Sequence, residues 1–159
     1  MPLLTIEQCR QQCRAEGEHD DALLGDLLAS AEDAAAAYLN RSLYADQEGL
    51  DAALDSLPDG AANASQAYET AAVEAAAEAD TAKAAAILSV AESRMGAWQL
   101  QAGRIMAGIV ANGSILAAIR LTLGHLYANR EDVVTGVSVA ELPQGAKALL
   151  RPYRRVMGP

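Results

Sequence analysis

Apolar positions recur at helical spacing in several parts of the chain, and the first two parts predict well-bounded helices. Thr5-Ile6-Glu7-Gln8 matches a capping box, in which Thr5 accepts a backbone N–H and Gln8 reaches back, so a first helix is expected to run to about Ala15 and end at Gly17. A second helix is expected to start at His19-Asp20-Asp21, whose carboxylates suit a helix N-terminus, and to stop at Asn40. Its apolar face consists of Leu24, Leu27, Leu28, Ala31, Ala35 and Tyr38.

The middle of the chain has a different texture. Residues 47–56 are expected to form a short helix, and Leu57-Pro58-Asp59-Gly60 predicts a turn. From Asn63 to about Gly96 the sequence is rich in Ala, and its larger apolar side chains are too sparse to form a continuous apolar stripe along a helix. As one helix this stretch would span roughly 50 Å. We interpret it as a protruding helix or a helical hairpin that packs closely through small residues.

Regular apolar patterning returns near the end. Asn112-Gly113 predicts a turn, and Ser114 is expected to cap a helix that is apolar on more than one face, which implies burial within the domain or between subunits. Residues 131–140 have the character of a loop. Pro143 fits the first turn of a last helix through Leu150, and Pro152 is expected to end or kink it.

Composition agrees with an all-α protein and adds an asymmetry of charge. Of 159 residues 36 are Ala, the strongest helix former, and the 52% of hydrophobic residues argues against disorder. Residues 1–90 hold 4 Lys and Arg against 17 Asp and Glu, whereas residues 91–159 hold 8 against 4. The net charge of −9 speaks against general affinity for nucleic acid. No apolar run of membrane-spanning length and no secretory signal is visible, so we expect a soluble protein made inside the cell.

The two cysteines are the only candidates for a metal site. Cys9 and Cys13 share a helical face, but a zinc site needs four ligands and the chain adds only His19 and His125. We therefore interpret both cysteines as small apolar side chains that face the core, and we predict no metal.

No catalytic constellation is found either. His125 has apolar neighbours along its helix, and no nucleophile signature of the G-x-S-x-G type accompanies it, so a structural histidine is the better interpretation. Gly103-x4-Gly108 is followed by Ile109-Val110 and lacks the Lys and Ser or Thr of a phosphate loop. The sequence predicts a protein that is not an enzyme and binds no cofactor.

The basic C-terminus has two interpretations. Arg151, Tyr153, Arg154 and Arg155 form either a solvated chain end or a docking segment. Arg and Tyr are enriched at binding hot spots, which favours docking.

Two blocks near the ends of the chain form a pattern that is typical of one protein family. The first block runs from Thr5 to Arg14 and continues with Gly17 and Asp20-Asp21-Ala22-Leu23-Leu24. The second block is more specific and consists of Ala117-Ala118-Ile119-Arg120, Gly124-His125-Leu126-Tyr127-Ala128-Asn129-Arg130-Glu131, Glu141-Leu142-Pro143 and Leu149-Leu150-Arg151-Pro152-Tyr153-Arg154. In these blocks the chain resembles the small head-tail connector proteins of long-tailed, double-stranded DNA phages, also called adaptor or head-completion proteins. The Ala-rich stretch between the blocks departs from compact members, which join these helices by a shorter connection.

The resemblance implies a single connector domain over residues 1–159 and a structural role in the virion. We expect a small bundle of about four core helices from residues 5–44 and 104–150, an Ala-rich helical insertion at about 46–103 and an extended tail at 151–159. Members form a ring, usually of twelve subunits, beneath the portal. The ring extends the DNA exit channel and seats the stopper or the tail, and DNA passes through it without specific binding.

Two sets of contacts are predicted on this basis. A ring requires two different complementary patches on each subunit, which an acidic body and a less acidic C-terminal portion would supply. We expect His125, Tyr127 and Arg130 to lie at subunit or core contacts. The portal is expected to bind a docking segment that comprises Leu149, Leu150, Arg151, Tyr153, Arg154 and Arg155.

Other functions remain as alternatives. A non-viral helical interaction module would bind its partner through residues 61–100. The interpretation as a DNA-binding regulator has little support, because the helix from Ser114 carries only Arg120 and Arg130 as cations.

Overall fold

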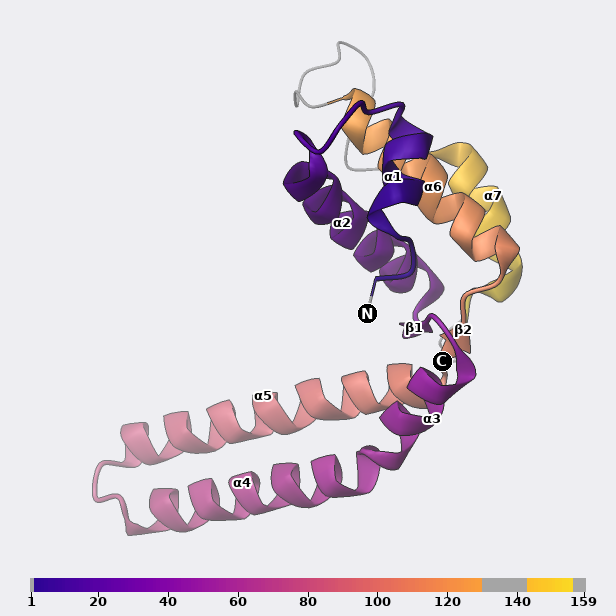
Figure 1. The fold of residues 1–159 in the computed structure, drawn as a ribbon. Helices are drawn as coiled ribbons and strands as arrows, with labels where there is room; N and C mark the ends of the chain where they lie inside the picture. The colour runs from indigo at the N-terminus through magenta and orange to yellow at the C-terminus, as the bar shows by residue number, and fades with distance from the viewer. Residues whose placement is uncertain (1, 130–142, 156–159) are drawn as a thin grey trace. The chain divides into compact units, whose positions relative to one another are not determined.

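A computed structural model describes residues 2–129 and 143–155 of the chain. These residues form seven α-helices, one 3-10 helix and one pair of very short strands (Figure 1). The prediction of an all-α fold is confirmed. The chain divides into two units, residues 1–47 together with 108–159 and residues 48–107. That the second unit is an insertion into a single connector domain stays a prediction.

The first unit is a bundle in which four helices share one core. Helix α6 packs against the other three, and α1 and α7 each also pack against α2. The four helices are α1 (Ile6–Cys13), α2 (Asp21–Leu39), α6 (Gly113–Ala128) and α7 (Gln144–Leu150).

Local sequence signals explain the bounds of the first two helices. The Thr5 hydroxyl accepts the N–H of Gln8 at 3.3 Å, and the Gln8 side chain accepts the N–H of Thr5 at 3.0 Å, so the predicted capping box is confirmed. Helix α1 ends at Cys13, earlier than predicted, because Arg14 adopts the left-handed conformation with φ 53°. Asn40 ends α2 in the same conformation with φ 54°, as predicted.

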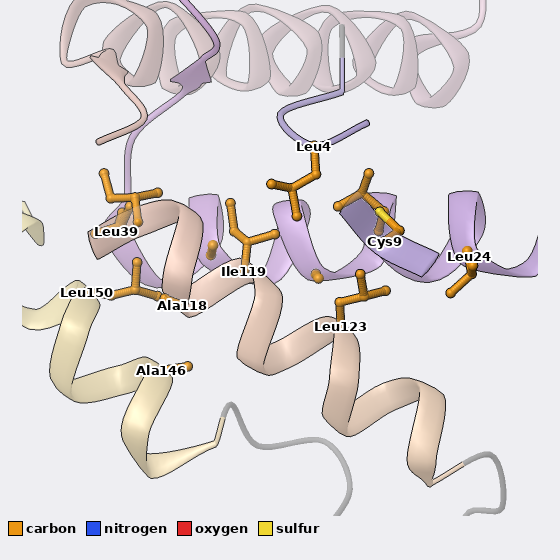
Figure 2. Packing of buried hydrophobic residues seen from close by; sticks show 13 residues of the cluster. Leu4, Cys9, Leu24, Leu39, Ala118, Ile119, Leu123, Ala146 and Leu150 are labelled. Carbon is orange, nitrogen blue, oxygen red and sulfur yellow. The ribbon is translucent and has the colours of Figure 1, made fainter. Parts of the chain in front are cut away.

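The core of the first unit consists mainly of Leu, Ile and Ala side chains from α2, α6 and α7, to which α1 adds Cys9. The labelled side chains of Figure 2, such as Ile119 and Leu123 of α6, converge in the space between the helices. Burying a Leu or Ile side chain fully contributes about 1.5–3 kcal/mol. The largest fully buried side chains are Leu24, Leu39, Ile115, Ile119, Leu123, Leu150 and Cys9.

A short parallel pairing closes the first unit where the chain leaves it and returns. Strand β1 (Leu43–Tyr44) pairs with β2 (Ile109–Val110), with Leu43 opposite Ile109. The Ala111 N–H donates to the Tyr44 carbonyl at 2.8 Å. The sequence analysis did not anticipate this pairing, which joins the two stretches of the first unit that precede and follow the second unit.

The second unit is built around a helical hairpin, one of the two forms predicted for the Ala-rich stretch. Helices α4 and α5 lie side by side in opposite directions (Figure 1). The Asp80 carboxylate begins α5 by accepting the N–H groups of Ala82 and Lys83 at 2.8 and 3.2 Å. The helices of this unit are α3 (Gln47–Asp55), α4 (Leu57–Ala77) and α5 (Thr81–Met106).

Two predicted boundaries are wrong. Leu57-Pro58-Asp59-Gly60 is the first turn of α4 and no separate turn, because Pro58 lacks an N–H at a position where the helix has no partner for one. Helix α6 is capped by Asn112, whose side chain accepts the N–H groups of Ser114 and Ile115 at 3.0 and 3.1 Å, and not by Ser114.

The C-terminal part follows the prediction more closely. Pro143 immediately precedes α7, and Pro152 lies in the 3-10 helix η1 (Arg151–Tyr153), which follows α7 directly. The loop predicted at 131–140 lies outside the described residues.

Candidate protein-binding surface

Helix α7 fixes the start of the predicted docking segment on the core of the first unit. The side chains of Ala146 and Leu150 are fully buried, and Leu149 is half-buried at the edge of the same cluster. The Leu150 side chain is thus not at the surface of the subunit. The sequence analysis had grouped it with residues that are expected to contact the portal.

Beyond α7, the chain is attached to the end of α2. The Arg155 N–H donates to the Leu39 carbonyl at 2.9 Å, which satisfies a carbonyl in the last turn of that helix. The Arg154 guanidinium lies 5.1 Å from the centre of the Tyr38 ring. Such a cation–π contact contributes about 0.5–1 kcal/mol at an exposed site. Tyr153 is half-buried against the core, so the segment has a defined position on the first unit.

The outer side of the segment is basic. The side chains of Arg151, Arg154 and Arg155 are exposed, and the half-buried ring of Tyr153 lies between them in sequence. Guanidinium groups bind carboxylates in a bidentate geometry, and an aromatic ring adds apolar contact area. The arrangement suits an acidic surface of another protein.

The three residues predicted at subunit or core contacts have different surroundings. The Tyr127 hydroxyl donates to the Asp20 carboxylate, so Tyr127 joins the end of α6 to the start of α2 within one subunit. The Asn129 side-chain amide donates to the His125 carbonyl at 2.8 Å and lies 3.2 Å from His125 Nδ1. Arg130 lies outside the described residues. A role at subunit contacts stays a prediction for all three.

The cysteines lie where the core interpretation places them. Cys9 is fully buried in the bundle core and Cys13 is half-buried beside it. Burial raises the pKa of both thiols, which favours the protonated form at neutral pH. Among the described residues, no group of three or more His, Cys, Asp and Glu side chains is arranged to hold a metal ion.

Two carboxylates of the first unit have shifted pKa values for opposite reasons. The Arg10 guanidinium donates to both carboxylate oxygens of Asp21, one bond being 2.7 Å long, and holds the pKa of Asp21 below its usual value. Burial raises the pKa of Glu32, although the Leu3 N–H donates to its Oε1 at 2.6 Å and opposes that shift. The two contacts connect α2 to α1 and to the N-terminal segment.

A second surface lies in the Ala-rich stretch, which the sequence analysis named as a binding region only for the alternative of a non-viral interaction module. The second unit exposes large apolar side chains, with 72% of Val73, 64% of Leu100 and 66% of Met106 accessible to solvent. A groove of about 440 Å³ lies between α4 and α5. The sparse Val and Leu positions within the Ala-rich stretch were the available signal.

Comparison with protein families decides between the functional classes. The model of the phage gp6-like head-tail connector protein family matches residues 4–95, more than half of the chain. The chain belongs to this family. It is therefore one of the structural proteins that join the head of a phage to its tail, and its place is the neck of the virion. No curated protein and no solved structure matches the chain significantly.

Membership in the connector family confirms the resemblance and bears on the alternatives. The match includes the first resembling block, α3, α4 and the first part of α5, and it ends before the second block, which begins at Ala117. The family is a structural one and no known enzyme class. A phage family also argues against a non-viral interaction module. Within the described ranges, no helix of this connector has the length and apolar character needed to cross a membrane.

Proposed function

We propose that this connector forms a ring of subunits, twelve in the virion, beneath the portal and extends the channel through which DNA leaves the head. The observation that carries the proposal is the match of residues 4–95 to the connector family. The lower end of the ring seats the stopper or tail-completion protein. The subunits are made in the cytoplasm of the bacterial host and join the head afterwards.

The portal is the proposed partner of the docking segment. Leu149, Arg151, Tyr153, Arg154 and Arg155 form the contact, and Leu150 holds the segment on the bundle. The attachment at Tyr38 and Leu39 supports this role. A segment that is already ordered loses less conformational entropy on binding than a free chain end.

The charge of the chain supports a conduit through which DNA passes without specific binding. A net charge of −9 repels phosphate, and affinity for DNA requires a surface that neutralises several phosphates. An acidic lining of the channel therefore lets the DNA pass without being held.

Charge reversal in the docking segment tests the portal contact. Co-expression of the Arg151→Glu/Arg154→Glu variant with the portal protein is expected to lower the amount of connector that co-purifies at least about tenfold, because like charges across an interface cost several kcal/mol. Arg14→Glu, which makes half of this charge change at another exposed position of the first unit, is the control. Imaging of the wild-type complex is expected to show a ring stacked on the portal.

The outcomes separate docking from folding. Removal of residues 149–159 would also remove the fully buried Leu150, so the deletion mixes loss of contact with loss of core. The double charge reversal changes exposed side chains only and is expected to leave the helical circular dichroism unchanged. Equal portal binding by the variant, the control and the wild type would contradict the proposed docking segment.

A further inference from the structure

The α4–α5 hairpin carries too much exposed apolar surface for the core that it has. The buried residues of the second unit are three alanines, Ala75, Ala91 and Ala102. Val73 and Val90, by contrast, are 72% and 49% exposed. Monomeric proteins seldom leave such side chains uncovered in one region, and a region that does so usually meets another protein.

The groove between the helices gives this surface a shape. Its walls contain small residues such as Ala71 and Ala86 together with the larger side chains of Tyr68, Ile87 and Val90. Small residues in the walls let the backbone of another helix approach closely. The groove therefore fits a helix with a modest apolar ridge.

The flank of the hairpin that contains the groove also carries charged residues. Lys83 and Arg94 of α5 and Glu74 of α4 line the groove. Lys83 forms an ion pair with Glu78 at 2.5 Å. Within the part of the chain that the structure describes, Arg94 has no ion-pair partner. The Arg94 guanidinium therefore lies beside an apolar groove and could pair with a carboxylate of another chain.

The opposite flank of the hairpin is acidic. Glu69 lies two residues from Ala67 and Ala71, which both line the groove, and Glu92 lies two residues from Val90 and Arg94. Two residues turn an α-helix by about 200°, so both carboxylates are directed away from the groove.

The acidic flank also has an exposed apolar side chain. Val73 is 72% exposed, lies two residues from the groove-lining Ala71 and follows Glu69 by one helical turn. The flank therefore presents an apolar side chain and a carboxylate side by side.

We propose that hairpins of neighbouring copies pack flank to flank, with the flank of one copy that carries Val73 and Glu92 in the α4–α5 groove of the next. Glu92 of one copy pairs with Arg94 of its neighbour. Two different flanks make the contact heterologous, which is the type of contact that builds rings. The inference rests on the proposed ring, and it assigns part of the subunit interface to the hairpin.

A charge swap between the two flanks tests the contact in the full chain. Arg94→Glu and Glu92→Arg are each expected to lower the assembled fraction, in solution or on co-expressed portal, at least about tenfold by placing like charges together. A mixture of the two single variants is expected to assemble, because each contact in an alternating arrangement then pairs unlike charges. The double variant Arg94→Glu/Glu92→Arg is expected to recover assembly for the same reason.

The readouts distinguish this inference from the proposed function. Portal co-purification reports docking, and counting subunits per portal particle by imaging reports assembly. If the wild type forms rings and the single variants form them equally well, the hairpin contact is wrong while the ring stands. Wild-type monomers bound to portal without a ring would overturn the hairpin contact and the ring together but leave portal docking intact.

Two further results would also contradict the contact between copies. A mixture of the single variants that fails to assemble would exclude a heterologous Glu92–Arg94 contact. Loss of a tail protein from Arg94→Glu particles that keep their full ring would assign the groove to that protein instead.

Discussion

The two units of this connector are stabilised in different ways. In the first unit, Leu24, Ile119 and Leu123 lose all contact with solvent inside a bundle of four helices. In the second unit, the buried side chains are alanines, and five of the six large apolar side chains that are exposed in the described structure belong to it. The first unit has a core of large buried side chains, whereas the second unit relies on helix propensity and on close contact between small residues.

This difference indicates where a partner is needed. Isolated helices are marginal in water, and most helical stability in proteins comes from burial of an apolar face. Alanine contributes high helix propensity but little buried area. A hairpin of this composition gains most from a surface that covers it, which is the condition that assembly with a neighbouring copy would meet.

The largest expected effect comes from removing core volume in the first unit. Ile119→Ala is expected to lower the free energy of unfolding by about 2–5 kcal/mol, because the side chain is fully buried and leaves a cavity. Val73→Ala on the hairpin is expected to change it by no more than about 0.5 kcal/mol, since the Val73 side chain is 72% exposed. Urea unfolding followed by circular dichroism measures both.

The test is the difference between the two variants in the free energy of unfolding. Equal losses from Ile119→Ala and Val73→Ala would mean that the hairpin surface is covered in the isolated protein, and the comparison of the two units would then be wrong.

Local signals in the sequence predicted much of the first unit. The capping box at Thr5 and the left-handed stop at Asn40 depend on neighbouring residues only, so both were found. The first turn of α4 was misassigned because Pro58 and Gly60 are as typical of a turn as of a helix start. The parallel pairing of Leu43 with Ile109 depends on contacts between distant parts of the chain, for which no local pattern exists.

The candidate surface shows the same limit. The sequence indicated a C-terminal segment with basic and aromatic side chains. In the structure the basic side chains of this segment are exposed and the Tyr153 ring is half-buried. That Leu150 is buried, and that Arg154 lies over the ring of Tyr38, follows from the packing of α7 and α2 and has no signature in the segment itself. The groove of the hairpin was not predicted, because its walls contain many alanines, which predict a helix without indicating the face that a partner covers.

A smaller effect is expected where Gly60 of α4 faces Trp98 of α5. A Cβ added at Gly60 would lie 3.1 Å from Trp98 Nε1, whereas a Cβ at Gly96 would meet no atom within 4 Å. Gly96→Ala is expected to stabilise the protein by about 0.5–1 kcal/mol through helix propensity. Gly60→Ala is expected to lose that gain, because the Trp98 ring must shift to admit the methyl group.

Unfolding curves and the fluorescence of Trp98, the single tryptophan of the chain, measure this pair of variants. A shifted emission maximum is expected for Gly60→Ala only. Equal stabilisation by both variants, with unchanged emission, would show that the two helices have room between them and do not pack closely at this point.

The smallest expected effect concerns the ion pair between Arg10 and Asp21 in the first unit. The pKa of Asp21 is lower in the folded protein than in the unfolded chain because the Arg10 guanidinium donates to the carboxylate. The unfolded chain therefore binds the proton more readily, so the contribution of the pair is present above the unfolded pKa and is lost as the pH falls through the folded pKa. Asp21→Asn is expected to lower the thermal midpoint at neutral pH, and the difference from wild type is expected to vanish in acid. Asp26→Asn, at an exposed position of the same helix, is expected to leave the midpoint unchanged. A deficit of Asp21→Asn that persists at low pH would assign the loss to packing of α2 on α1 and not to the ion pair.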